Sequence, residues 1–165
     1  MNEYPSHTIS LLVANKSGTL VRIATLFSRR GFNIESLVVS PALDGRFSRM
    51  TITACGKEAT LEQIIKQLSK LVDVIHAGEH DPDASVVREL ALIKITATER
   101  NRSHILQLVQ HFKARTVDFT DDTIIIELTG NSEKIDAAVE MLGQFGVLES
   151  IRTGKVIISR GPHQT

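Results

Sequence analysis

Short apolar runs alternate with segments of helical periodicity in the first half of the chain. The apolar runs are β-prone and predict strands at residues 8–14, 34–40, 47–54 and 72–77. Apolar side chains at helical spacing predict helices at residues 19–30 and 60–71. The resulting order, βαββαβ, is that of a ferredoxin-like α+β fold, with a four-stranded antiparallel sheet and both helices on one face.

The same order of elements recurs after a polar stretch. Apolar patterning predicts strands at residues 88–98, 115–119, 123–129, 147–151 and 156–159, and helices at residues 103–113 and from Asn131 or Ser132 onward. We therefore predict two ferredoxin-like domains. Their expected limits are residues 1–78 for the first domain, 79–86 for a linker that contains Pro82, and 87–165 for a C-terminal domain.

Cap signals mark the ends of the predicted helices. Ser17 or Asn15 is expected to cap the first helix, and Gly31 stands at the usual C-terminal glycine position. Thr60 and Gln63 have the spacing of a capping box and predict the start of the second helix.

Composition and charge exclude several classes of function. The 165 residues include 19 basic and 19 acidic side chains, a balance that gives no basic stripe for nucleic acid or for an anionic membrane surface. No apolar run approaches the roughly 20 residues that cross a bilayer, and the first residues lack an apolar signal region. Cys55 is the one cysteine, which excludes an internal disulfide. We expect a cytoplasmic protein that binds neither nucleic acid nor membrane.

Known catalytic and metal-binding patterns are missing from the sequence. The histidine pairs His76/His80 and His104/His111 have no second pair at zinc spacing. The adjacent carboxylates at residues 121–122 lie in a predicted turn, where both are solvated and point apart. We therefore predict no metal site, no catalytic residues and no enzymatic activity.

The turn Asn15-Lys16-Ser17-Gly18 has a functional geometry. It joins the first strand to the first helix, whose N-terminus offers unpaired N–H groups and a partial positive charge. Gly18 lets a ligand approach the backbone, and Asn15 supplies both a donor and an acceptor. The pattern fits a site for a free amino acid, but a simple capped turn is the commoner explanation of the same residues.

Longer stretches resemble a known family. The sequences NKSGTL at residues 15–20, FSRRGFNIESL at 27–37 and SRMTI at 48–52 closely resemble the ACT domain of the small, regulatory subunit of acetohydroxyacid synthase, also called acetolactate synthase. The sequences RELALIK at 88–94 and RTGKV at 152–156 extend the resemblance over nearly the whole chain.

The resemblance implies a function carried out with a partner. A small subunit of this family binds the catalytic large subunit, raises its activity and confers feedback inhibition by valine in branched-chain amino acid biosynthesis. Thiamine diphosphate, FAD and magnesium are then expected in the catalytic partner and not in this chain. An ACT-type amino-acid sensor that regulates a different biosynthetic enzyme is the alternative.

The resemblance also implies an effector site built by two chains. Asn15, Gly18, Thr19 and Leu20 are expected to line it from one chain, and Asn33 and Ile34 from the other. A helix of about 13 residues separates the two groups by roughly 20 Å, so a single valine cannot touch both within one chain. We therefore predict a homodimer that pairs through the second strand, an edge of the sheet.

Four points stay open at the level of sequence. Ala14 stands where the family usually has an acidic residue, which bears on effector affinity. The pattern does not rank valine against leucine or isoleucine, and it identifies neither the surface that docks the catalytic subunit nor the role of the C-terminal domain. An RNA-binding role would require exposed aromatic residues and basic character, and aromatic residues are only 4% of this chain.

Overall fold

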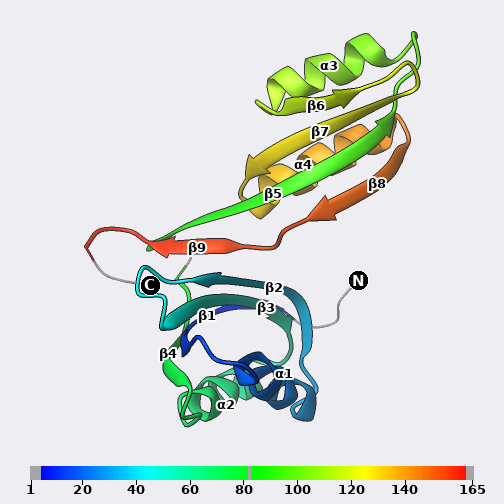
Figure 1. The fold of residues 1–165 in the computed structure, drawn as a ribbon. Coiled ribbons are helices and arrows are strands. Elements are labelled where there is room, and N and C mark those ends of the chain that lie inside the picture. Colours follow the sequence, from blue (N-terminus) through cyan, green and yellow to red (C-terminus); the bar gives the residue numbers. More distant parts are fainter. Residues whose placement is uncertain (1–4, 82, 163–165) are drawn as a thin grey trace. The chain divides into compact units, whose positions relative to one another are not determined.

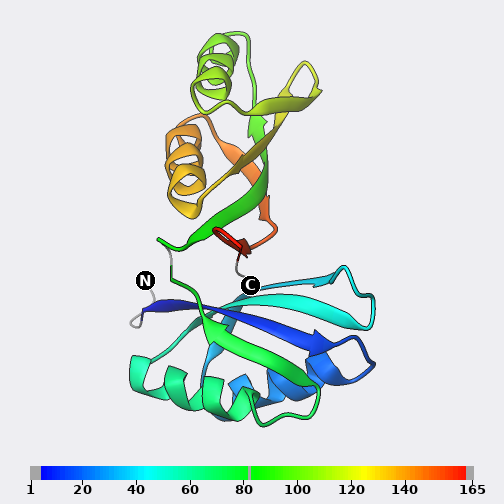
Figure 2. The same ribbon diagram turned by 90° about the vertical axis from the view of Figure 1, so that its left-hand side faces the viewer.

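A computed structural model describes residues 5–81 and 83–162 of the chain (Figures 1 and 2). The chain divides into two compact units. One unit is Val87–Gly154, and the other combines the residues up to Val86 with those from Lys155 onward. Both units are α+β, with antiparallel sheets, as the periodicity predicts.

The first unit has the predicted βαββαβ order. Its elements are β1 (Ser6–Ala14), α1 (Thr19–Arg29), β2 (Asn33–Pro41), β3 (Phe47–Cys55), α2 (Glu58–Leu68) and β4 (Val74–Glu79). The strands form one antiparallel sheet in the order β2-β3-β1-β4, which confirms that β2 is an edge strand. Both helices cover the same face of this sheet (Figures 1 and 2).

Strand alternation builds the core of the first unit. On β1, Ile9 and Leu11 point toward the helices, and their register partners on β3 are Ile52 and Met50. The helices supply further buried side chains at helical spacing: Ile23 and Phe27 from α1, and Leu61, Ile64 and Leu68 from α2. Burial of each such side chain contributes roughly 1.5–3 kcal/mol to the free energy of folding, and this holds both helices against the sheet.

The second unit repeats the arrangement. Its elements are β5 (Ser85–Thr96), α3 (Arg102–His111), β6 (Arg115–Phe119), β7 (Thr123–Gly130), α4 (Ser132–Gly143) and β8 (Val147–Arg152). The strand order is β6-β7-β5-β8. The short C-terminal strand β9 (Val156–Ser159) lies among the residues that group with the first unit. Ile93, Ile95, Ile105, Ile124 and Ile135 are fully buried between sheet and helices.

The structure divides the chain differently from the expected limits. The expected linker at 79–86 is shorter, because β4 runs to Glu79 and β5 begins at Ser85; Pro82 lies outside the described residues. Residues from Lys155 onward group with the first unit and not with the second. The Arg160 backbone N–H donates to the Ala84 carbonyl at 2.8 Å, a contact between distant residues that apolar periodicity cannot reveal.

The helix caps confirm some expectations and contradict others. Gly31 has a φ of 71° after the end of α1, as predicted. The capping box at Thr60 is wrong, because α2 begins at Glu58 and its N-cap, Lys57, makes no side-chain cap bond. Asn131 does cap α4, since its side chain accepts a hydrogen bond from the backbone N–H of Lys134 at 3.1 Å.

Candidate functional site

The turn between β1 and α1 is held by a hairpin distant in sequence. The Asn15 backbone N–H donates to the Arg46 carbonyl at 2.8 Å, and its Nδ2 donates to the Gly45 carbonyl at 3.1 Å. Asn15 therefore fastens the turn to the β2–β3 connection, and the expectation that Asn15 or Ser17 caps α1 is wrong.

Gly18 is the N-cap of α1. Its φ of 85° lies in the left-handed region that favours glycine, and a Cβ placed there meets no atom within 4 Å. The N-cap makes no side-chain hydrogen bond, and the Thr19 backbone N–H donates to the Lys16 carbonyl at 3.4 Å. The helix N-terminus still carries a partial positive charge beside the open space at Gly18. This is the geometry of a helix end that can receive a carboxylate.

The next two predicted site residues differ in their surroundings. Thr19 is only 3% exposed, and its Oγ1 donates to the Ala14 carbonyl at 3.4 Å. Leu20 is 41% exposed and offers an apolar surface beside the helix N-terminus. Within this group, the accessible contacts are therefore the backbone at Gly18 and the side chains of Asn15 and Leu20.

Asn33 and Ile34 lie beyond the other end of α1, at the start of the edge strand β2. They line a surface hollow of about 420 Å³, together with Ala24, Phe27, Ser28, Gly31 and Phe32. The two groups of predicted site residues are thus not brought together within one chain. The 11 residues of α1 separate them by about 16 Å, longer than any single amino acid.

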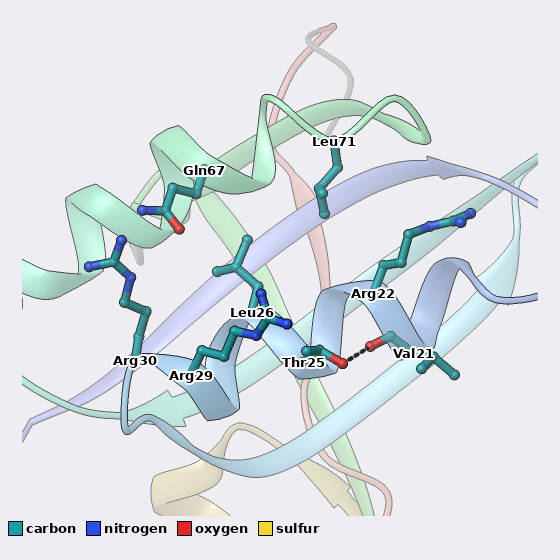
Figure 3. A pocket seen from close by; sticks show the side chains of 8 residues that line it. All are labelled: Val21, Arg22, Thr25, Leu26, Arg29, Arg30, Gln67 and Leu71. Atoms are coloured by element: carbon teal, nitrogen blue, oxygen red, sulfur yellow. Dashed lines mark hydrogen bonds between the residues drawn. The ribbon is translucent and has the colours of Figure 1, made fainter.

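A second hollow, of about 570 Å³, lies between α1 and α2 (Figure 3). Its lining is Val21, Arg22, Thr25, Leu26, Arg29, Arg30, Gln67 and Leu71. The groove has no direct signature in the sequence. The spacing of seven between Arg22 and Arg29 indicates that both lie on one side of a helix, but only the packing of α2 shows that this side borders a groove.

A charged cluster in the second unit joins three of its elements. Glu89 on β5 is 5% exposed; it accepts a hydrogen bond from Ser132 Oγ and two from Arg152, at 3.0 and 2.8 Å. Arg152 also contacts Asp136 at 2.5 Å. Burial opposes the charge of Arg152, but these hydrogen bonds outweigh it and raise its pKa. The carboxylate of Glu89 is occupied by its partners, so the cluster fastens β8 and α4 to β5.

The described residues offer no metal centre, since no three potential metal-ligating side chains gather among them.

Burial lowers the pKa of His80, whose Nδ1 lies 2.8 Å from Ser85 Oγ. Within residues 5–81 and 83–162, no helix has the length and apolar character needed to cross a membrane.

Two family models match the chain, one over each half. Residues 9–76 match the model described as "AHAS small subunit-like ACT domain", and residues 88–161 match "Small subunit of acetolactate synthase". The chain is 47% identical over 158 residues to the acetolactate synthase small subunit of Mycobacterium leprae, covering 96% of this chain and 94% of that protein. It is 46% identical over 161 residues to the small subunit of Mycolicibacterium smegmatis, and the match covers 98% of this chain and 95% of that protein.

A solved structure shows the same similarity in three dimensions. The crystal structure of the acetolactate synthase small subunit from Thermotoga maritima matches with a TM-score of 0.85 at 39% sequence identity. The match covers 96% of this chain and 99% of that chain, so it includes both units.

Proposed function

The chain belongs to the family of acetolactate synthase small subunits, and from this premise we propose that it senses valine as a homodimer and controls a catalytic large subunit. It activates that subunit when free of valine and confers feedback inhibition when valine binds. The chain itself is regulatory and carries no catalysis. Thiamine diphosphate, FAD and magnesium belong to the catalytic partner.

One observation carries this proposal: the two halves of the expected site lie at opposite ends of α1, beside the edge strand β2. If the β2 strands of two chains pair antiparallel about a two-fold axis, the two α1 helices also run antiparallel. The N-terminus of each α1 then comes to the C-terminal end of the other. The Gly18 turn of one chain faces the Asn33 hollow of its partner, which gives two equivalent sites per dimer.

The chemistry of these two halves suits a free branched-chain amino acid. The N-terminus of α1 offers N–H groups and partial positive charge for the carboxylate. The amide oxygens of Asn15 and Asn33 are of the type that accepts hydrogen bonds from an ammonium group. Leu20 and Ile34 supply apolar surface for the branched side chain, whose burial favours binding.

Regulation then follows from linkage. Valine that touches both chains binds more tightly to one dimer arrangement than to another, and only such a difference in affinity transmits a signal. A coupling free energy of about 1–3 kcal/mol is typical for this kind of control. The dimer arrangement stabilised by valine is the one in which the catalytic subunit is less active.

A sensor for a different enzyme is disfavoured by the second half of the chain. An ACT domain alone occurs in many regulators, but residues 88–161 match the model of the acetolactate synthase small subunit itself. The matches to the two relatives also extend over 94–95% of the length of those small subunits.

The first prediction compares Gly18→Asp with Gly18→Asn. Both side chains tolerate the left-handed conformation, favour the N-cap position and have nearly equal size, so both variants should fold. The aspartate places a negative charge where the carboxylate of valine binds, and like charges in contact cost several kcal/mol. Calorimetry should show valine affinity reduced by about thirtyfold or more in Gly18→Asp.

The asparagine variant isolates the effect of charge from that of size. Gly18→Asn should retain clearly more valine affinity, and both variants should still activate the catalytic subunit. Equal valine affinity in wild type and Gly18→Asp would refute the site. Running the same titrations with leucine and isoleucine ranks the three amino acids.

A further inference from the structure

The groove between α1 and α2 is lined by side chains of these two helices and of the segment that follows α2 (Figure 3). Its floor is apolar: Leu26 of α1 and Leu71, which follows α2, point toward each other between the two helices (Figure 3). Val21 stands on its rim and is 67% exposed. The groove therefore offers apolar surface that the first unit itself does not cover.

The charge of the groove is one-sided. Arg22, Arg29 and Arg30 line it, and no carboxylate side chain does. Arg22 is ion-paired with Asp73, whereas none of the carboxylates whose side chains the structure describes forms an ion pair with Arg29 or Arg30. Arg30 donates to the neutral Gln63 at 3.5 Å. The chain as a whole is electrically balanced, so this positive charge is a local feature.

The shape of the groove favours an elongated occupant. Arg22 and Arg29 are seven residues apart on one side of α1, about 10 Å along its axis, with Leu26 between them. A groove between two helices is a surface on which a third, amphipathic helix packs. A small anion contacts one arginine end and leaves the leucine floor open, whereas a helix covers both.

We propose that this groove docks an acidic amphipathic helix of the catalytic subunit. The apolar side of that helix packs on Leu26 and Leu71, and its carboxylates pair with Arg29 and Arg30. Arginine is suited to this role because its guanidinium binds a carboxylate through two parallel hydrogen bonds. The inference rests on the proposed function, and it supplies a surface by which the regulatory chain holds its catalytic partner.

The test measures the concentration of the full chain at which activation of the catalytic subunit is half-saturated. The double variant Arg29→Glu/Arg30→Glu should raise this concentration by about tenfold or more, because it replaces attraction with repulsion across the interface. The matched control is Arg100→Glu/Arg115→Glu, which makes the same change in net charge at exposed positions of the second unit. The control should behave like wild type.

Substitutions at a neutral residue of the groove separate the effect of charge on docking from any effect on folding. Gln67 lines the groove and carries no charge. Gln67→Glu should raise the half-saturating concentration, and Gln67→Lys should leave it unchanged or lower it. The difference between the two variants should shrink at high salt, because salt screens charges at an exposed rim.

The outcomes separate this inference from the proposed function. If wild type activates and the groove variants match it, the docking surface is wrong and the proposed function stands. If wild type itself activates no catalytic subunit, the proposed function fails and the inference with it. A groove that instead binds a small anion leaves the half-saturating concentration equal in all variants, which also overturns the inference.

Discussion

At the scale of single residues, Phe32 stabilises the C-terminal end of α1. Its backbone N–H and that of Gly31 donate to the carbonyls of Phe27 and Ser28, both at 3.1 Å, in the hydrogen-bond pattern of a Schellman motif. The Phe32 ring packs edge to face against Phe27, with ring centroids 6.4 Å apart. On another side it covers Gly56, where a Cβ would lie 2.3 Å from the ring.

The second prediction follows from this contact. Gly56→Ala forces the buried Phe32 ring to move, and overpacking of this kind costs about 1–3 kcal/mol of the free energy of unfolding. Chemical denaturation of the two variants measures the loss. Gly45→Ala is the matched control, since a Cβ there meets no atom within 4 Å, and it should change stability by less than about 0.5 kcal/mol. Equal stability of the two variants would contradict the role of the ring.

The residues of the β1–α1 turn show where local reasoning reaches its limit. The residue types of Asn15 and Gly18 indicate a turn, and the resemblance to a known family implies their place in the site. Their roles in the turn depend on the hairpin at Gly45 and Arg46, which is 30 residues away in sequence. That hairpin binds the Asn15 amide and leaves the N-cap position to Gly18. Cap propensity ranks residues by local chemistry and contains no term for such a distant partner.

At the scale of elements, helices α1, α2 and α4 begin in different ways. In α4, Asn131 has extended backbone angles and its side chain accepts from Lys134, as an N-cap does. At α1 and α2 no side chain performs this role. The start of α2 therefore depends on burial of Leu61 and Ile64, and it comes two residues before the capping-box position.

The third prediction tests the cap of α4. Asn131→Ala removes the acceptor for the Lys134 N–H and should lower the free energy of unfolding by about 1 kcal/mol. Asn131→Asp keeps an acceptor at the same place and should stay within a few tenths of a kcal/mol of wild type. Thermal unfolding monitored by circular dichroism distinguishes them. An alanine variant as stable as the aspartate variant would show that packing alone starts this helix.

The whole molecule is proposed to be a dimer with two shared sites, and this leads to the fourth prediction. Gly18→Asp and Asn33→Ala should each weaken valine binding at every site, because each substitution alters both sites of its own homodimer. In a mixed dimer, one site contains both substitutions and the other contains neither. Mixing the two weakened variants after unfolding and refolding should therefore restore wild-type affinity at about a quarter of the valine sites.

Calorimetry of the mixture, compared with each variant alone, gives the answer. A site built within one chain would stay broken in every mixed dimer, so the absence of any recovery would contradict the shared site. Sedimentation of the wild-type chain provides the necessary control, since the argument requires that dimers form. A chain that is monomeric and still responds fully to valine would overturn the proposed assembly.

The sequence by itself determined the fold class and the order of the elements. It could do so because strand alternation, helical spacing and turn chemistry are local properties of neighbouring residues. The residues of the candidate site come from the resemblance to a known family, and they stay a prediction. The tertiary structure alone decided four features: the anchoring of Asn15 to a distant hairpin, the early start of α2, the grouping of the C-terminal residues with the first unit, and the arginine-lined groove. Each depends on which distant segments pack together, and local periodicity contains no information about those partners.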